Sequence, residues 1–233
     1  MVDILNSRTG TTIDLSFMAS LECDLKCLHC MYWSSPKNKV QLDYDKVCRW
    51  VETINWRDIH ACGFYGGEPS ILPELYQQYM DLVPVVIPKF MITDGTWSKS
   101  REKTESLVAM AHRNNLQVFI SQTPYHLPYQ DQAELDTLVM TYPGRFFLKG
   151  NDKIISMGRA RNFTPGGCTG ICAEWIKPYR IALHPTLGII FQSCDGSYPV
   201  LQGLDRPFSE VKQNIYRVIE NCVMKAGRKV SAK

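Results

Sequence analysis

Through roughly the first 150 residues, segments with the apolar pattern of a strand alternate with segments that have the pattern of a helix. Every second residue from Ile13 to Phe17 is apolar, which is typical of a strand with one buried face. From Asp43 onward, apolar residues recur every three or four positions, as they do on a helix with one buried face. The same reading predicts further strands at residues 61–65, 89–93, 116–121, 145–148 and 154–157. It predicts helices at about residues 43–54, 70–80, 98–113 and 135–142.

Capping residues mark where three of these helices are expected to begin. Asp43, Ser70 and either Ser98 or Ser100 carry side-chain oxygens that can accept from the free N–H groups of a first helical turn. The alternation of strands and helices predicts a parallel sheet with right-handed crossover connections. One spacing departs from this plan, because only residues 150–152 separate the last two predicted strands, too few for a crossover helix. Either the sheet is shortened there or one of these two segments is a loop.

The pattern changes again after residue 160. Apolar segments at residues 179–183 and 189–191 flank the turn Pro185-Thr186-Leu187-Gly188, which predicts a β-hairpin. A final helix is expected to begin near Ser209, with an apolar side that includes Val211 and Ile215.

Composition narrows the class of protein. A chain of 233 residues with 45% hydrophobic content can bury a full core as one main domain. The net charge of +3 is compatible with an anionic substrate but is too weak to indicate nucleic-acid binding. No apolar run approaches membrane-spanning length, so we expect a soluble cytoplasmic protein without a membrane partner. Nine cysteines without an export signal favour thiols kept for metal over a disulfide framework.

Three cysteines lie close together in one predicted loop, with the spacing Cys23-x-x-x-Cys27-x-x-Cys30. Cysteine thiolates are soft, charged ligands and are the usual protein ligands of iron–sulfur clusters. Three of them can hold three corners of a four-iron cluster and leave the fourth iron open. The alternative is a structural zinc site, which commonly uses four ligands in two paired C-x-x-C units. No second unit of that kind follows at the usual distance.

A second motif, Gly66-Gly67-Glu68-Pro69, follows the second predicted strand. Together the two motifs resemble those of the radical S-adenosylmethionine (SAM) superfamily. The resemblance implies that Cys23, Cys27 and Cys30 ligate a 4Fe-4S cluster whose open iron binds SAM. It implies that the segment from Gly66 to Pro69 binds SAM, with Glu68 accepting from the SAM ammonium and Gly66 and Gly67 allowing close approach of the backbone.

Weaker similarities to the same superfamily extend this candidate SAM site. His29 stands where the family often has an aromatic ring near the adenine, although it is equally consistent with a loop histidine without a role. The stretch Ile92-Thr93-Asp94-Gly95-Thr96 resembles the turn after the third strand, which places Asp94 at the site. Ser121, at the end of the fourth strand, matches a serine that contacts the SAM ribose. Each of these signals alone is weak, since a glycine-containing turn after a strand is commonplace.

The resemblance also implies the fold. It predicts an α/β protein built on a partial (βα)6-type parallel barrel, with the cluster at the carboxyl edge of the strands. In this prediction residues 1–160 form the radical SAM core. Residues 161–233 form a cysteine-containing extension made of a small β-hairpin and a C-terminal helix.

Cysteines in the extension suggest a further metal site. Gly158-Arg159-Ala160, followed by Cys168, Cys172, Gly188 and Cys194, resembles the first half of a SPASM domain or its shorter twitch form. Such extensions hold an auxiliary iron–sulfur cluster, which would use Cys168, Cys172 and Cys194 here. The fourth ligand is unassigned, and the alternatives for these three cysteines are a zinc site or free thiols.

The predicted activity is reductive cleavage of SAM to a 5'-deoxyadenosyl radical, which abstracts hydrogen from a substrate. That substrate is a peptide residue, a nucleoside or an amino-acid derivative, and the resemblance implies an electron donor such as flavodoxin or ferredoxin. The alternative is a non-catalytic cysteine–metal protein that senses iron or zinc and binds a partner. Replacing Glu68 distinguishes the two, since only the enzyme would lose affinity for SAM.

Overall fold

The computed structural model describes residues 13–150, 159, 178–192 and 199–230. The strands are β1 (Ile13–Phe17), β2 (Ile59–Phe64), β3 (Lys89–Thr93), β4 (Leu116–Ser121), β5 (Phe146–Lys149), β6 (Tyr179–His184), β7 (Gly188–Phe191) and β8 (Val200–Gln202). The helices longer than one turn are α1 (Tyr44–Val51), α2 (Pro73–Asp81), α3 (Arg101–Arg113), α4 (Gln132–Thr141) and α6 (Phe208–Val230). None of the helices in these ranges is both long enough and apolar enough to cross a membrane.

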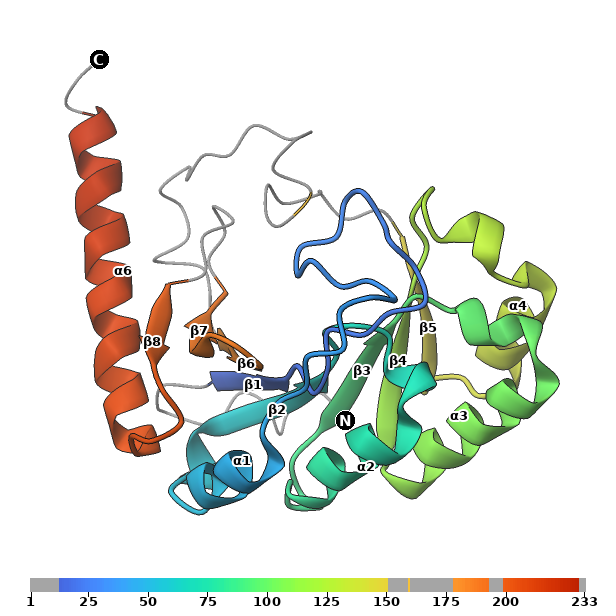
Figure 1. The fold of residues 1–233 in the computed structure, drawn as a ribbon, viewed down its shortest axis with the longest axis horizontal. Coiled ribbons are helices and arrows are strands. Elements are labelled where there is room, and N and C mark those ends of the chain that lie inside the picture. The colour runs from blue at the N-terminus through green and yellow to red at the C-terminus, as the bar shows by residue number, and fades with distance from the viewer. Residues whose placement is uncertain (1–12, 151–158, 160–177, 193–198, 231–233) are drawn as a thin grey trace.

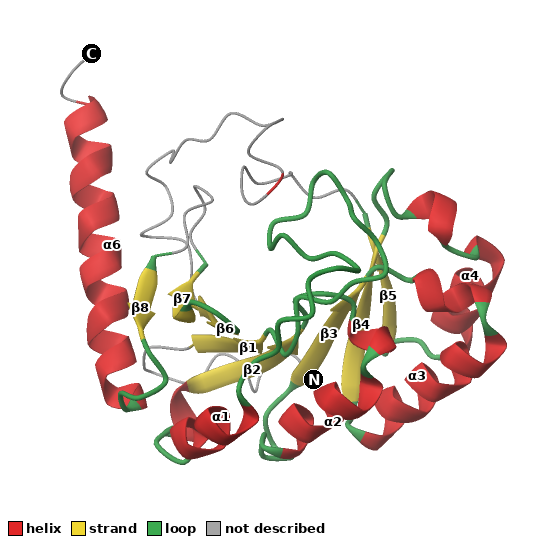
Figure 2. Cartoon of the chain, in the orientation of Figure 1, coloured by secondary structure: helices red, strands yellow, loops and turns green. Residues whose placement is uncertain are grey.

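Among the described residues, the strands form one open sheet in the order β5-β4-β3-β2-β1-β6-β7-β8. The first six positions of this order are joined by parallel pairs, and β7 and β8 continue it as antiparallel strands. Helices α1 to α4 cover one face of the sheet, and α6 stands beside β8 (Figure 1). Figure 2 shows the loop that follows β1 lying over the carboxyl ends of the strands. The mixed α/β class and the open, mostly parallel sheet confirm the predicted fold.

The predicted hairpin is present as β6 and β7, but its first strand belongs to the parallel sheet. Tyr179 pairs with Ile13 and Leu183 pairs with Phe17, so β6 lies directly beside β1. The strand predicted at residues 154–157 falls outside the described residues, as does the predicted domain boundary after residue 160. The sixth parallel strand that the structure contains is therefore β6.

Helix beginnings match the capping residues in two cases out of three. Asp43 caps α1 by accepting from the Lys46 N–H at 3.0 Å, and Ser100 rather than Ser98 caps α3. The prediction for Ser70 was wrong, because α2 begins later, at Pro73, after a short 3-10 turn at Pro69–Ile71. Proline is favoured in a first helical turn, where its missing N–H would have no partner.

The main core lies between the sheet and the helices. Alternate residues of β1 point into it, and the rings of Phe17 and Phe64 stack there with centroids 5.3 Å apart. Trp50 of α1 meets the edge of Phe208, which joins the start of α6 to the same core. Burying each such side chain contributes about 1.5–3 kcal/mol. This packing holds β1 to β4 in register, so that the loops at their carboxyl ends meet.

Candidate functional site

The first component of the site is the loop between β1 and α1, residues 18–43, here called the cysteine loop. Its two arms are joined near the sheet by backbone hydrogen bonds, from Leu21 N to Val40 O at 3.0 Å and from Cys23 N to Ser35 O at 3.3 Å. Cys23 therefore lies in the part of the loop whose backbone these hydrogen bonds hold in place. Cys27 and Cys30 lie further along, toward the tip of the loop, where Cys30 N donates to Cys27 O at 3.2 Å.

The glycine pair after β2 packs directly against the base of this loop. Gly67 N donates to Ser20 O at 2.7 Å, and Glu68 N donates to Glu22 O at 2.8 Å. A Cβ on Gly66 would lie 2.6 Å from Ser20 O, and one on Gly67 would lie 1.7 Å from Glu22 O. Gly66 also has a φ of +137°, which favours glycine. Within the protein itself, glycine is therefore needed at these positions for contact with the cysteine loop.

Glu68 joins the end of β2 to the end of β3. Its side chain is buried, and Oε1 accepts from Ser70 N at 3.0 Å and from Thr93 Oγ1 at 2.7 Å. Oε2 accepts from Asp94 N at 2.8 Å. Burial raises the pKa of Glu68, although these hydrogen bonds oppose the shift. Pro69, the last residue of the motif, is buried at the start of the 3-10 turn that Glu68 caps.

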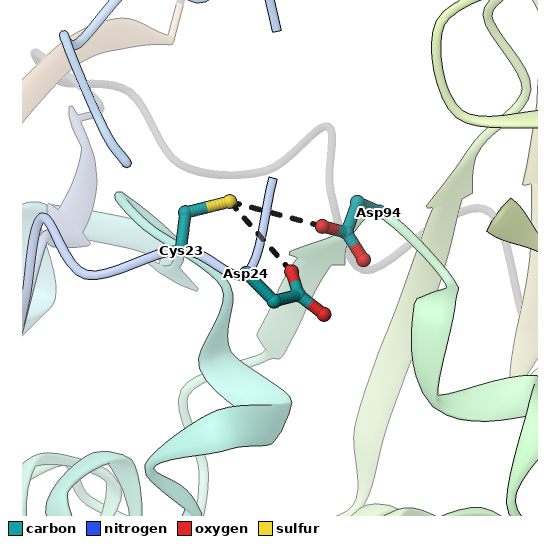
Figure 3. Close-up of side chains that lie close together, drawn as sticks. All are labelled: Cys23, Asp24 and Asp94. Atoms are coloured by element: carbon teal, nitrogen blue, oxygen red, sulfur yellow. Dashed lines mark hydrogen bonds between the residues drawn. The ribbon is translucent and has the colours of Figure 1, made fainter. Parts of the chain in front are cut away.

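Asp94 places a second buried carboxyl group beside Cys23. Cys23 Sγ lies 3.8 Å from Asp94 Oδ2 and 3.9 Å from Asp24 Oδ1, as Figure 3 shows. Thr96 Oγ1 lies 2.9 Å from Asp94 Oδ1 and 2.6 Å from Asp24 Oδ2, and its one hydrogen can be donated to either carboxyl group. Burial, followed by the charges of Glu68 and Asp24, raises the pKa of Asp94 to about 10. Such a concentration of acidic groups is well suited to a ligand that carries positive charge.

The other two cysteines face the same region. Burial first, and then the charges of Cys30 and Asp94, raise the pKa of the Cys27 thiol to about 12. Asp94 and Asp24 also act on Cys23, whose thiol pKa is raised mainly by burial. The same two carboxyl groups therefore influence both Cys23 and Cys27, and Cys30 lies close enough to influence Cys27.

His29 projects from the tip of the cysteine loop onto the segment that follows β4. Its ring stacks on Tyr125 with centroids 4.4 Å apart, and His126 lies 5.1 Å away. The buried Nδ1 atom of His29 has no hydrogen-bond partner among the described residues. Burial, followed by the nearby Arg159, lowers the pKa of His29, so the ring stays neutral at physiological pH.

Ser121 is the last residue of β4 and is linked to the rest of the site through Gln130. The Gln130 amide donates to the Ser121 carbonyl at 2.9 Å and also to the Asp94 carbonyl. The structure thus connects the ends of β2, β3 and β4 through side chains that accept from or donate to the backbone. Sequence analysis did not identify Gln130, Asp24 or Tyr125. Asp24 occupies a variable position of the cysteine motif, and the other two belong to no motif described above.

The remaining predicted metal ligands lie outside this description. Cys168, Cys172 and Cys194 fall outside the described residues. Gly188, part of the same pattern, occupies the turn between β6 and β7 with a φ of +79°. A Cβ there would lie 2.7 Å from Gln202 O, so the turn and the neighbouring strand both favour glycine.

The residues present fit the two groups that the cysteine motif implies. Three soft thiols around one region suit an iron–sulfur cluster better than a hard cation. The buried carboxyl groups of Glu68 and Asp94 suit a cationic amino acid, and the unpartnered nitrogen of His29 suits a polar heterocycle. A ligand that combines both features, as SAM does, matches this arrangement.

Comparison with known proteins agrees with this geometry. The family model named "Radical SAM superfamily" matches residues 20–125, from the cysteine loop to the segment after β4. This part of the chain is therefore similar to the radical SAM superfamily. The matched region includes the residues named in the candidate site except His126, Gln130 and Arg159.

Several known proteins are similar to this chain at low sequence identity. The putative peptide biosynthesis protein YydG of Bacillus subtilis (strain 168) is 23% identical over 120 residues, which cover 50% of this chain and 38% of YydG. Among solved structures, anSMEcpe with bound AdoMet is 21% identical, with a TM-score of 0.43 over 59% of this chain and 42% of its own. Streptococcus suis SuiB bound to S-adenosylmethionine is 11% identical, with a TM-score of 0.41 over 86% and 65% of the two chains. The matched region therefore spans 38% of the length of YydG and 42% of the length of anSMEcpe.

Proposed function

We propose that this protein is a radical SAM enzyme in which Cys23, Cys27 and Cys30 hold a 4Fe-4S cluster. The observation that carries the proposal is the meeting of two buried carboxyl groups, Glu68 and Asp94, with the cysteine loop at the carboxyl edge of the sheet. When bound, the cluster and SAM supply the electron transfer and carbon–sulfur bond cleavage that generate a 5'-deoxyadenosyl radical. The protein binds and orients SAM and presents one hydrogen of the substrate.

Each described side chain has a separate task in this proposal. Glu68 and Asp94 face the positive charge of SAM, which favours their charged forms and so opposes the rise in pKa that burial causes. His29 and Tyr125, already stacked on each other, bind at the adenine. Ser121 binds the ribose from the end of β4.

We propose a peptide as the substrate. The similarity to YydG, which is described as a peptide biosynthesis protein, supports a peptide over a nucleoside or a free amino-acid derivative. The resemblance of Cys168, Cys172 and Cys194 to a SPASM or twitch pattern supports the same class and a second, auxiliary iron–sulfur cluster. Flavodoxin or ferredoxin is the proposed electron donor, and the reducing cytoplasm is the proposed compartment because it preserves free thiols.

The test uses Glu68→Gln rather than an alanine substitution. Removing the side chain would leave Ser70 N, Thr93 Oγ1 and Asp94 N without their acceptor, at a cost of about 1–3 kcal/mol for each buried group. Glutamine keeps the size and one acceptor oxygen but removes the charge. We expect the Kd for SAM to rise about 10- to 100-fold, since a charge-assisted hydrogen bond contributes about 1.5–3 kcal/mol.

Iron content and product formation complete the experiment. The Glu68→Gln protein should retain the wild-type iron content after anaerobic reconstitution, and Glu105→Gln, on the surface of α3, should behave as wild type in both assays. Wild-type protein reduced with dithionite should convert SAM to 5'-deoxyadenosine. If the wild type binds iron or zinc but does not bind or cleave SAM, the protein is instead a non-catalytic cysteine–metal protein.

A further inference from the structure

Arg159, which lies between β5 and β6 in the sequence, is bonded to the cysteine loop at three points. Its backbone N donates to Cys30 O at 2.9 Å. Its guanidinium donates from Nε to Cys27 O at 2.8 Å and from Nη2 to Ser34 O at 2.6 Å. One residue from a distant part of the chain thus contacts the two cysteines nearest the tip of the loop and the residue where the loop turns back.

The guanidinium has the shape that these contacts require. Its planar, rigid fork can donate along two directions at once, which the single ammonium of lysine cannot reproduce in the same geometry. The contact also continues into the second motif, because Ser34 Oγ donates to Gly66 O at 2.8 Å. Arg159 therefore connects the tip of the loop, through Ser34, to the Gly66-Gly67-Glu68 segment.

The charge of Arg159 acts on the same region. The Arg159 Nε atom lies 2.8 Å from the carbonyl oxygen of Cys27 and the Arg159 backbone N lies 2.9 Å from that of Cys30, so the positive charge is held beside two of the three cysteines. A fixed positive charge near iron–sulfur ligands stabilises the more negative, reduced form of a cluster. Net charge around a cluster is one of the factors that set its reduction potential.

We propose that Arg159 is a positioning residue for the cluster, which fixes the backbone that carries Cys27 and Cys30 and raises the reduction potential by its charge. The inference rests on the proposed function, since it requires a cluster on the three cysteines. The forked shape of the guanidinium and its positive charge have separate effects in this inference, and each can be measured. Loading of iron depends on the fork, and the midpoint potential depends on the charge.

Two substitutions separate these effects. Arg159→Lys keeps the charge and loses the fork, whereas Arg159→Gln keeps an N–H donor and loses the charge. Arg145→Gln is the matched control, because the Arg145 guanidinium also donates to two backbone carbonyls, Ala111 O at 2.7 Å and Leu116 O at 3.3 Å, away from the cysteine loop. Each protein is reconstituted anaerobically, its iron is counted, and its midpoint potential is measured without SAM by titration with dithionite.

We expect both Arg159 variants to take up iron more slowly than wild type. The loaded Arg159→Gln protein should have a more negative midpoint potential, with at least a threefold smaller equilibrium constant for one-electron reduction, about 28 mV at 59 mV per tenfold change. The loaded Arg159→Lys protein should keep a potential close to wild type, as should Arg145→Gln. Circular dichroism of each variant separates these effects from a general loss of folding.

Two results would overturn the inference while leaving the proposed function intact. One is a loaded Arg159→Gln protein with the wild-type potential, which would make Arg159 merely structural. The other is wild-type rates of iron uptake in both variants. If the wild-type chain itself holds no cluster on Cys23, Cys27 and Cys30, the proposed function has failed instead.

Discussion

At the scale of single residues, the site depends on positions where no side chain fits. Gly67 lies so close to the cysteine loop that the backbone of Glu22 occupies the place of a Cβ. The loop and the Gly66-Gly67-Glu68 segment can therefore approach each other only when this residue is glycine. The contact contributes both to stability and to the position of Cys23, which follows Glu22 directly.

We predict that Gly67→Ala lowers the free energy of unfolding by about 1–3 kcal/mol, the usual cost of overpacking, because a Cβ 1.7 Å from a backbone oxygen forces the two segments apart. Urea unfolding measures the change, and iron uptake should decrease in parallel. Gly150→Ala is the control, since a Cβ at Gly150 meets no atom of the described residues within 4 Å. Equal urea midpoints for the two variants would contradict the close contact.

At the scale of elements, the turn between β6 and β7 contains a buried histidine that acts as an acceptor. His184 Nδ1 accepts from Thr186 N at 3.2 Å and from Leu187 N at 3.3 Å, so this nitrogen carries no proton in the folded state. Burial lowers the pKa of His184 to about 4, whereas a histidine in an unfolded chain has a pKa of about 6.5. Between these pH values the unfolded chain binds a proton that the folded chain does not.

We therefore predict that His184 decreases the free energy of unfolding as pH falls from about 6.5 to about 4. His184→Asn keeps an oxygen that can accept from the same backbone N–H groups but does not titrate. As pH falls through this range, the free energy of unfolding should decrease more for wild type than for His184→Asn. Urea unfolding at several pH values measures it, and a constant difference would show that His184 is not held neutral by the fold.

At the scale of the whole molecule, iron content reports how many clusters the chain holds. We predict about eight irons per chain after anaerobic reconstitution, falling to about four when Cys23, Cys27 and Cys30 are all replaced by alanine, because each 4Fe-4S cluster carries four. Cys168, Cys172 and Cys194 would then hold the remainder. If wild type holds about four irons and the triple alanine variant holds none, the proposed cluster on Cys23, Cys27 and Cys30 stands, and the auxiliary cluster is excluded.

The sequence predicted most of the parallel sheet, because strand and helix patterns depend on neighbouring residues. It also singled out Cys23 and Glu68, both of which the structure places in contact with Asp94. The pairing of β6 with β1 was not predicted, since contacts between distant segments leave no local pattern. The role of Arg159 was missed for a related reason: its guanidinium binds backbone carbonyls, which every residue has. The cap at Ser70 failed because Glu68 accepts from the backbone N–H of Ser70 itself.

The position of β1 between β2 and β6 has a consequence for how the chain is made. About 160 residues separate β1 from the strand that covers its second edge. At a synthesis rate of about 5–20 residues per second, that edge waits roughly ten to thirty seconds for its partner. During this interval its unpaired N–H and C=O groups can pair with another chain. The free edge of β1 can therefore take part in aggregation while the chain is being synthesised, until β6 pairs with it.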